Sequence, residues 1–443
     1  MRRHDQFSLS QPWIAHPHAK ELEAISTILD ANPAIAEAVA ANLILGVKNP
    51  ETGSPGMSGD QVLRVLLLKQ MKGFSYEELH FHLMDSGTYR TFCRFGLMED
   101  VPGRSTLAEN IKKVRAETLE QVNRHLLEHA KLKGVEKGRK VRIDATVVET
   151  NIRKPTDSSL LYDGVALLAR LLSEAKELIG YRHWSDHTRR AKRRMLAVQN
   201  ARTATKREEA YRDLLKVSRK TLGYAEGALE ALPSAGDATA KLRAHMEEAA
   251  RWLRAVIDQT ERRVLRGETV PVEEKVVSFF EPHTDIIVKD RRETHYGHKV
   301  TLTGGASGLI LDLVIESGNP ADSTRVVPML ERQCEIYGRV PRQASFDGGY
   351  ASKANLAQAK ALGVKDVCFS KKRGLEITDM VKSTWVYRQL RNFRAGVEGL
   401  ISYLKRAFGL DRCTWKGQLS FGSYVWSSVL SANLLTLARI ALN

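Results

Sequence analysis

Residues 391–412 read RNFRAGVEGLISYLKRAFGLDR, and the spacing of their apolar residues predicts one amphipathic α-helix. At about 3.6 residues per turn, one face of this helix is apolar, and the neighbouring stripe carries a single carboxylate among cations. The apolar face contains Phe393, Val397, Ile401, Leu404 and Phe408, and the charged stripe contains Arg391, Arg394, Glu398, Ser402 and Lys405. Taken alone, the stripe is typical of a solvent-exposed surface on which Glu398 pairs with Arg394, a pair worth about 0.2–0.5 kcal/mol.

Two aspartates upstream change this interpretation. Asp144 lies in VRIDATVVET (141–150), where apolar and polar residues alternate and indicate a β-strand. Asp347 lies in RQASFDGGYAS (342–352), after a short strand and before two glycines, a position where aspartate often only forms a turn. With Glu398, the two aspartates would supply three carboxylates from three separate elements. Such a set predicts a site for hard divalent cations and, with two ions, metal-dependent phosphoryl transfer.

Taken together, these segments resemble the DDE transposases of bacterial insertion sequences, specifically the four/five superfamily, whose catalytic domain is ribonuclease H-like. The helix of that family carries a tyrosine, an arginine, the catalytic glutamate and a lysine. Arg394, Glu398 and Lys405 match this signature, whereas Arg391 stands at the tyrosine position. Three further segments resemble the strands and the turn of the family: DATVVETNI (144–152), YGHKVTL (296–302) and DGGYAS (347–352).

The resemblance covers most of residues 57–153 and 283–439, and it implies both a fold and a reaction. The fold would be an α/β ribonuclease H-like catalytic domain with an N-terminal all-α domain and a helical insert between its first and second strands. Asp144, Asp347 and Glu398 would be the catalytic residues and would bind two Mg²⁺ ions, with Mn²⁺ as the alternative metal. The enzyme would cut DNA at the transposon ends and transfer the resulting 3′-hydroxyl groups to a target DNA.

The resemblance also implies the partners of the protein. Terminal inverted repeats and target DNA are the expected DNA partners, and a homodimer is expected on DNA because two ends must be joined. Three residues of the charged stripe are expected to contact DNA phosphates: Arg391, Arg394 and Lys405. Two rival functions stay open: a ribonuclease H-like nuclease that cuts without strand transfer, and a non-catalytic DNA-binding protein derived from a transposase.

The charge of the chain is consistent with a nucleic-acid partner. The 443 residues carry a net charge of +16, and the sequence pI is about 9.6. An excess of this size favours a polyanion through phosphate attraction. A basic enzyme without a nucleic-acid role is the alternative.

Three features predict a cytoplasmic protein that does not span a membrane, and the resemblance implies that it is associated with the bacterial nucleoid. The N-terminus, MRRHDQFSLS, lacks the apolar core of a secretion signal. The four cysteines form no CxxC pair, so neither a zinc ribbon nor a disulfide framework is indicated. The most apolar segment, residues 424–443, contains serine, asparagine and arginine and is interpreted as a buried terminal helix.

The order of these patterns predicts how the chain divides. Residues 1–135 form an N-terminal helical, DNA-binding domain, 136–157 contain the first strand of the catalytic domain, 158–270 form a helical basic insert, and 271–443 hold the rest of the catalytic domain and a C-terminal helix.

In the first segment, Ser58 and Ser75 each begin a helix with a capping box. Thr106 is expected to begin one long helix that ends near Leu132. A helix-turn-helix DNA reader and an ordinary helical bundle both fit this region, and the resemblance favours the DNA reader.

The insert contains the most one-signed charge run of the chain. Arg189, Arg190, Lys192, Arg193 and Arg194 are nearly contiguous. A charge run of this kind usually forms a solvated face. Here we expect DNA phosphate contacts from four arginines: Arg189, Arg190, Arg193 and Arg194.

After residue 282 the pattern changes to alternating strands and helices. A hairpin is expected to turn at residues 306–308, and strands are expected before Asp347 and over residues 365–370. Asp322 or Ser323 is expected to cap the helix that runs to about Tyr337, and no role beyond capping is expected of Asp322. This order of elements is typical of an α/β domain.

Overall fold

The chain forms two units, each with its own hydrophobic core. The computed structural model describes residues 12–49, 52, 56–233, 236–289 and 293–443. The first unit, called here the sheet unit, comprises Met1–Asn151 and Ile287–Asn443. The second, the helical unit, comprises Ile152–Ile286. The N-terminal segment considered for a secretion signal lies outside the described residues.

The N-terminal part of the sheet unit is helical. Its helices are α1 (Pro17–Asp30), α2 (Pro33–Ile44), α3 (Gly59–Lys72), α4 (Tyr76–Asp85), α5 (Gly87–Phe92), α6 (Arg104–Lys113) and α7 (Ala116–Leu132). The capping boxes predicted at Ser58 and Ser75 are confirmed. Each serine hydroxyl accepts the backbone N–H three residues later, and the side chain of that later residue accepts the backbone N–H of the serine. α3 ends at Gly73, which has the left-handed conformation that glycine adopts easily.

The prediction of one long helix beginning at Thr106 is wrong. α6 begins earlier, at Arg104, and ends at Lys113, and α7 follows as a separate helix. Val114 and Arg115 between them are extended. The break is stabilised by a long-range contact, because the Asn42 side chain accepts the Arg115 N–H at 2.8 Å. Local capping signals could not reveal that contact.

A six-stranded mixed sheet forms the second half of the sheet unit. Its strands are β1 (Lys140–Glu149), β2 (Asp285–Lys289), β3 (Glu293–Gly304), β4 (Ile310–Ile315), β5 (Gln343–Phe346) and β6 (Asp366–Phe369). The order is β2-β3-β1-β5-β6, and β4 also pairs with β3. β1 is antiparallel to β3 and parallel to β5, so it lies at the junction of the two kinds of pairing. The β3–β4 hairpin is confirmed, whereas the short strand β2 was not predicted.

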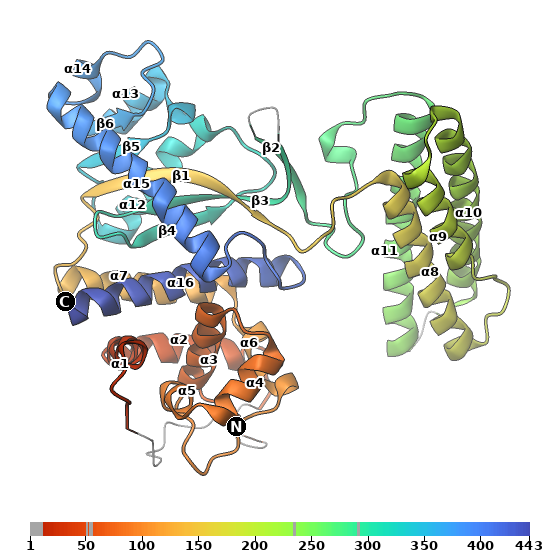
Figure 1. Ribbon diagram of the computed structural model, residues 1–443, viewed down its shortest axis with the longest axis horizontal. Helices are drawn as coiled ribbons and strands as arrows, with labels where there is room; N and C mark the ends of the chain where they lie inside the picture. The colour runs from red at the N-terminus through yellow and green to blue at the C-terminus, as the bar shows by residue number, and fades with distance from the viewer. Residues whose placement is uncertain (1–11, 50–51, 53–55, 234–235, 290–292) are drawn as a thin grey trace. The chain divides into compact units, whose positions relative to one another are not determined.

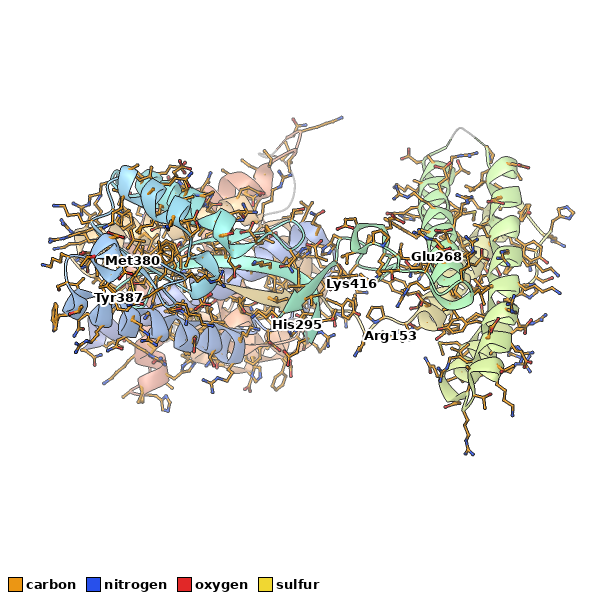
Figure 2. The ribbon with its side chains drawn as sticks, turned by 90° about the horizontal axis from the view of Figure 1, so that it is seen from above. Arg153, Glu268, His295, Met380, Tyr387 and Lys416 are labelled. Carbon is orange, nitrogen blue, oxygen red and sulfur yellow. The ribbon has the colours of Figure 1, made fainter. Side chains whose placement is uncertain are left out.

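The helices after β4 are those that position the candidate site. They are α12 (Val326–Tyr337), α13 (Lys353–Ala361), α14 (Ile377–Met380), α15 (Thr384–Phe408) and α16 (Gln418–Leu442), with 3₁₀ turns at Asp322–Arg325 and Gly348–Tyr350. α15 contains residues 391–408 of the stretch predicted as a helix, ends before the left-handed Gly409, and runs across β1, β5 and β6 (Figure 1). In its first turn, the Tyr387 hydroxyl donates to the Phe369 carbonyl at 3.0 Å. Met380, which precedes α15, is fully buried (Figure 2).

The apolar C-terminal helix is a core helix, as predicted. α16 is the one helix in the described part of the chain that is long and apolar enough to cross a membrane. However, 67% of its most apolar window is buried inside the protein. It packs against α1, α3 and α7 (Figure 1). Its hydropathy is therefore explained by burial in the core.

The helices of the helical unit lie between β1 and β2 in the sequence. Its helices are α8 (Asp157–Ile179), α9 (Thr188–Asn200), α10 (Ala204–Ala231) and α11 (Asp237–Thr260), followed by a π-helical turn at Glu261–Leu265 and a 3₁₀ turn at Val272–Glu274. Leu161, Leu214 and Leu253, from three different helices, lie fully or almost fully buried in its core. Helix–helix packing therefore explains the apolar residues of this segment.

Candidate active site

One arginine joins the three carboxylates that the sequence singled out. Arg394 donates from Nη2 to Asp144 Oδ2 at 2.9 Å and from Nη1 to Glu398 Oε1 at 2.8 Å. Its Nη2 also lies 3.3 Å from Asp347 Oδ1. The carboxylates come from β1, from the end of β5 and from α15. The fold therefore brings together Asp144 and Arg394, which lie 250 positions apart in the sequence.

Asp144 is held within the sheet, on the face of β1 that meets α15. It pairs with Leu302 of β3, and its Oδ1 accepts the N–H of Ala145 at 2.8 Å. Burial raises the pKa of Asp144, and the neighbouring charges of Asp347 and Asp322 raise it further, while the Ala145 N–H and Arg394 act in the opposite direction. A carboxylate in such a position is stabilised by added positive charge.

Asp347 follows β5 directly and is more exposed than Asp144. Its Oδ1 accepts the hydroxyl of Ser370 at 2.7 Å, and Ser370 follows the neighbouring parallel strand β6. Burial raises the pKa of Asp347, but Ser370, the Gly348 N–H, Arg394 and Lys371 together lower it below its usual value. Lys371 packs so closely on Gly348 that a Cβ there would lie 2.8 Å from the lysine side chain. The glycine is thus required for the turn that presents Asp347.

Glu398 is the outermost of the three carboxylates. Its side chain is 68% exposed, against 16% for Asp144 and 40% for Asp347. The apolar stripe of α15 faces inward as predicted, with Val397, Leu404 and Phe408 buried. The helix therefore fixes the backbone of Glu398, while its carboxylate stays open to solvent.

The donor set suits a hard divalent cation in its chemistry. Three carboxylates face one region, and four carboxylates raise the pKa of the buried Tyr350 hydroxyl after burial itself: Asp322, Asp144, Glu316 and Asp347. Among the described residues, no three acidic, histidine or cysteine side chains lie close enough to share one ion. Arg394 lies between the carboxylates, and its guanidinium is the cation that all three contact. The three carboxylates are thus of the chemical type that binds Mg²⁺, and in this structure they are brought together by Arg394.

Asp322 does more than cap a helix, so that prediction is wrong. The 3₁₀ turn has Ala321 as its N-cap, and α12 begins only at Val326. Instead, Asp322 Oδ1 lies 2.5 Å from Nζ of Lys299, a residue of β3 that is 8% exposed. A buried ammonium needs a counter-charge, and Asp322 supplies it. This ion pair places a further carboxylate beside Asp144.

The other predicted residues of α15 lie outside this cluster. Lys405 Nζ contacts Asp411 at 3.2 Å. Arg391 is exposed, near the N-terminal half of the helix. Both remain predicted DNA contacts. Only Arg394 among the expected DNA-binding residues touches the carboxylates.

The four arginines predicted to bind DNA from the insert all lie on α9. Arg190 and Arg194 both pair with Asp213 of α10. Burial raises the pKa of Asp213, but the two arginines lower it overall. Arg189 and Arg193 are exposed and belong to a different row of the helix. The run is therefore divided between two arginines that pair with Asp213 and two arginines in a separate exposed row.

Sequence reasoning missed several residues that shape the site. Ser370, Lys299 and Arg142 each contact a site residue or the helix that carries one. Ser370 could have been found, because polar residues at the carboxyl ends of neighbouring parallel strands meet at one edge of a sheet. Lys299 and Arg142 gave no local signal.

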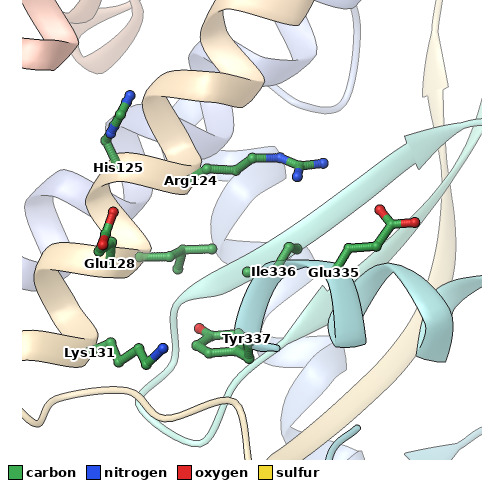
Figure 3. A pocket seen from close by; sticks show the side chains of 8 residues that line it. Arg124, His125, Glu128, Lys131, Glu335, Ile336 and Tyr337 are labelled. Carbon is green, nitrogen blue, oxygen red and sulfur yellow. The ribbon is translucent and has the colours of Figure 1, made fainter. Parts of the chain in front are cut away.

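A hollow of about 290 Å³ lies elsewhere in the sheet unit, between α7 and α12 (Figure 3). Charges of both signs line it, and Tyr337 lies at its α12 side. The lining residues are Arg124, His125, Leu127, Glu128, Lys131, Glu335, Ile336 and Tyr337. None of the three predicted catalytic carboxylates belongs to it, so we assign the site to the Arg394 cluster.

A mixed sheet crossed by a helix, with carboxylates around one cation, is an arrangement suited to phosphoryl transfer. Two family models match the chain: a transposase DDE domain over residues 274–434 and a second transposase domain over residues 13–113. Together they span more than half of the sequence, and the chain belongs to the DDE transposases, a family typical of bacterial insertion sequences. DNA is therefore its partner, and the resemblance inferred from the motifs is confirmed. Comparison with curated proteins and with solved structures gives no match.

Proposed function

We propose that this transposase binds the ends of its insertion sequence, cleaves the DNA there and transfers the 3′-hydroxyl ends to target DNA. The observation that carries the proposal is the convergence of Asp144, Asp347 and Glu398 on Arg394. The catalytic domain would have the ribonuclease H-like fold. The placement of β1 between an antiparallel and a parallel neighbour supports that assignment.

In this proposal, Asp144, Asp347 and Glu398 hold the divalent ions, with Mg²⁺ as the expected metal. Two such ions, when bound, supply activation of an attacking oxygen and stabilisation of the leaving oxygen. The Ala145 N–H and the Ser370 hydroxyl hold the two aspartates in fixed orientations. No covalent protein nucleophile is required, because water cuts first and the freed 3′-hydroxyl attacks next.

Arg394 has two roles in the proposal. It offsets the repulsion among the three carboxylates in the absence of substrate, because its guanidinium contacts all of them. When DNA enters, the same planar group can grip a phosphate in two places. Arg391 and Lys405 would contact the backbone on either side along α15.

The remaining basic surfaces would bind DNA away from the chemistry. Residues 1–135 would contact the terminal repeats, and Arg189, Arg190, Arg193 and Arg194 would add phosphate contacts from the insert. Two protomers would assemble on DNA, because two ends must be joined. The protein would act on DNA in the cytoplasm. We keep the four predicted domain segments as part of this proposal.

The test is a reconstituted transposition reaction. A plasmid carries a selectable marker between the two DNA segments that flank the coding region, and a second plasmid serves as target. Purified protein with Mg²⁺ should cut at both flanks and produce marker insertions in the target. Chelation by EDTA should stop both products.

The same reaction separates the rival functions. End cleavage without insertion would favour a nuclease that lacks strand transfer. End binding without any cleavage, in Mg²⁺ or Mn²⁺, would favour a DNA-binding protein that has lost catalysis. Insertion products with cleaved ends would exclude both rivals.

A further inference from the structure

The face of β1 that meets α15 is charged, and its opposite face is core. Lys140, Arg142 and Asp144 alternate along the strand. Val141 and Ile143, which point to the other side, are fully buried. Asp144 belongs to the proposed catalytic set, so the two cations beside it need an explanation.

Arg142 connects β1 to α15. Its Nη1 donates to the carbonyl of Phe393 at 3.1 Å. Its guanidinium carbon lies 4.8 Å from the centre of the Phe393 ring, and Lys140 Nζ lies 4.4 Å from the same ring. Cation–π contacts of this kind add attraction to the hydrogen bond. One side chain of β1 thus holds the backbone and the ring of the residue that precedes Arg394.

Two glycines leave the space that Arg142 occupies. Gly304 is the β3 partner of Arg142, and a Cβ there would lie 3.2 Å from Arg142 Nε. On α15, a Cβ at Gly396 would collide with Arg142 Nη1. Glycine within a strand often marks such a close approach. Gly399, one turn later on the same helix, differs, because a Cβ there would meet nothing within 4 Å.

We propose that Arg142, seated against Gly396, is a positioning residue that fixes Glu398 relative to Asp144. The inference rests on the proposed function, because it assigns both carboxylates to the reaction. Gly396 lies two residues before Glu398, about 3 Å along the helix axis. A shift of α15 on β1 therefore moves Glu398 by the same amount. Misplacement of a catalytic group by about 1 Å can cost about a hundredfold in rate.

Gly396→Ala breaks this contact without removing Arg142 or Glu398. The atom in the way is the far end of a flexible side chain, so the new methyl group should displace the Arg142 guanidinium. Alanine also favours the helix by about 1 kcal/mol over glycine. We therefore expect a single-turnover cleavage rate at saturating DNA at least tenfold below wild type, with the dissociation constant for end DNA unchanged and no loss of melting temperature.

Gly399→Ala is the matched control. It makes the same substitution on the same helix, in open space. It should raise the melting temperature and leave the cleavage rate within about twofold of wild type. Equal cleavage rates in Gly396→Ala and Gly399→Ala would overturn the proposal.

A second measurement tests the contact independently of activity. In the wild-type background, Gly396→Ala must displace Arg142, whereas in an Arg142→Met background the space is already free. Gly396→Ala should therefore raise the melting temperature more in Arg142→Met than in wild type. Additive effects of the two substitutions would overturn the contact. Arg142→Lys should cleave no faster than Arg142→Met, because lysine lacks the planar group that reaches Phe393.

The outcomes separate this inference from the proposed function. If wild-type protein does not cleave, the proposed function fails, and the positioning role fails with it. If wild type cleaves and Asp347→Asn does not, the carboxylates are catalytic. A Gly396→Ala variant that cleaves normally in that setting would refute the role of Arg142 alone.

Discussion

Two ion-pair clusters built around arginine have opposite charge balance. In the sheet unit, one arginine contacts three carboxylates, and its side chain is only 14% exposed. In the helical unit, Arg190 and Arg194 share the single carboxylate of Asp213, and each is almost half exposed. The first cluster is left with excess negative charge and the second with excess positive charge. The same residue type thus marks a proposed cation site in one place and a candidate phosphate-binding surface in the other.

The difference shows why a charge run has to be judged by its neighbours. The α9 run looks more basic in sequence than the α15 stripe, yet half of its predicted DNA contacts are engaged by Asp213. The α15 stripe looks like an ordinary surface pair, yet its arginine reaches two aspartates from distant segments. Substitutions in each cluster should therefore affect different measurements.

The largest effect is expected from loss of one carboxylate charge. Asp347→Asn keeps the side-chain shape but removes a charge from the Arg394 cluster. Cleavage should fall at least a hundredfold, about 2.7 kcal/mol of transition-state stabilisation, while affinity for end DNA stays within about threefold. Asp379→Asn, at an exposed site on α14, should cleave normally. More than about a tenth of wild-type cleavage in Asp347→Asn would remove Asp347 from the catalytic set.

A smaller loss is expected when Arg394 keeps its charge but loses its shape. Lysine cannot reach three carboxylates or hold a phosphate in two places. Arg394→Lys should slow cleavage at saturating Mg²⁺ by tenfold or more, about 1.4 kcal/mol. Full activity with an unchanged melting temperature would mean that the planar guanidinium of Arg394 makes no contribution to cleavage.

Substitutions in the helical unit should change the affinity for DNA and not the rate of cleavage. Replacing Arg189, Arg190, Arg193 and Arg194 together by glutamine should flatten the salt dependence of DNA binding. Each lost phosphate contact reduces the log–log slope by about 0.9. Because Arg190 and Arg194 are engaged by Asp213, Arg189→Gln with Arg193→Gln should account for most of the change. Fluorescence anisotropy over a salt series measures it, and an unchanged slope would identify α9 as a solvated face.

The smallest effect is expected at Lys405. Its ammonium contacts Asp411 and not the three carboxylates, and an exposed pair of this kind is worth about 0–1 kcal/mol. Lys405→Ala should lower cleavage and strand transfer by less than tenfold without changing the fold, as judged by melting temperature. A loss as large as that of Asp347→Asn would place Lys405 inside the reaction centre.

Local signals allowed much of the fold to be predicted. Alternation in VRIDATVVET identified β1, helical spacing identified α15, and two capping boxes identified the starts of α3 and α4. In each case the signal lies within a few residues of the element it predicts. Where a distant residue decides the structure, prediction failed, as at Arg115, whose N–H is bound by Asn42.

The candidate site was predictable only through the family resemblance. Asp347 alone has the pattern of a turn residue, and Glu398 alone has the pattern of a surface pair. Their approach to Asp144 depends on strand order, which no local pattern contains. Asp322 was misjudged for the same reason, because its partner Lys299 lies on another strand. Arg142 looked like one polar residue of an alternating strand, although it reaches the carbonyl of Phe393.

The entry of the helical unit between β1 and β2 sets the order in which the protein can form during synthesis. α8 to α11 form their core from one continuous segment, so they can fold as soon as they leave the ribosome. The sheet unit cannot, because β1 waits for β3 and β5 while the intervening unit is made, on the order of ten seconds at about 5–20 residues per second. Arg394 and Glu398 emerge later still, and α16, which packs on α1, α3 and α7, emerges last. The carboxylates therefore converge only when the chain is nearly complete, and truncated chains should lack a formed site.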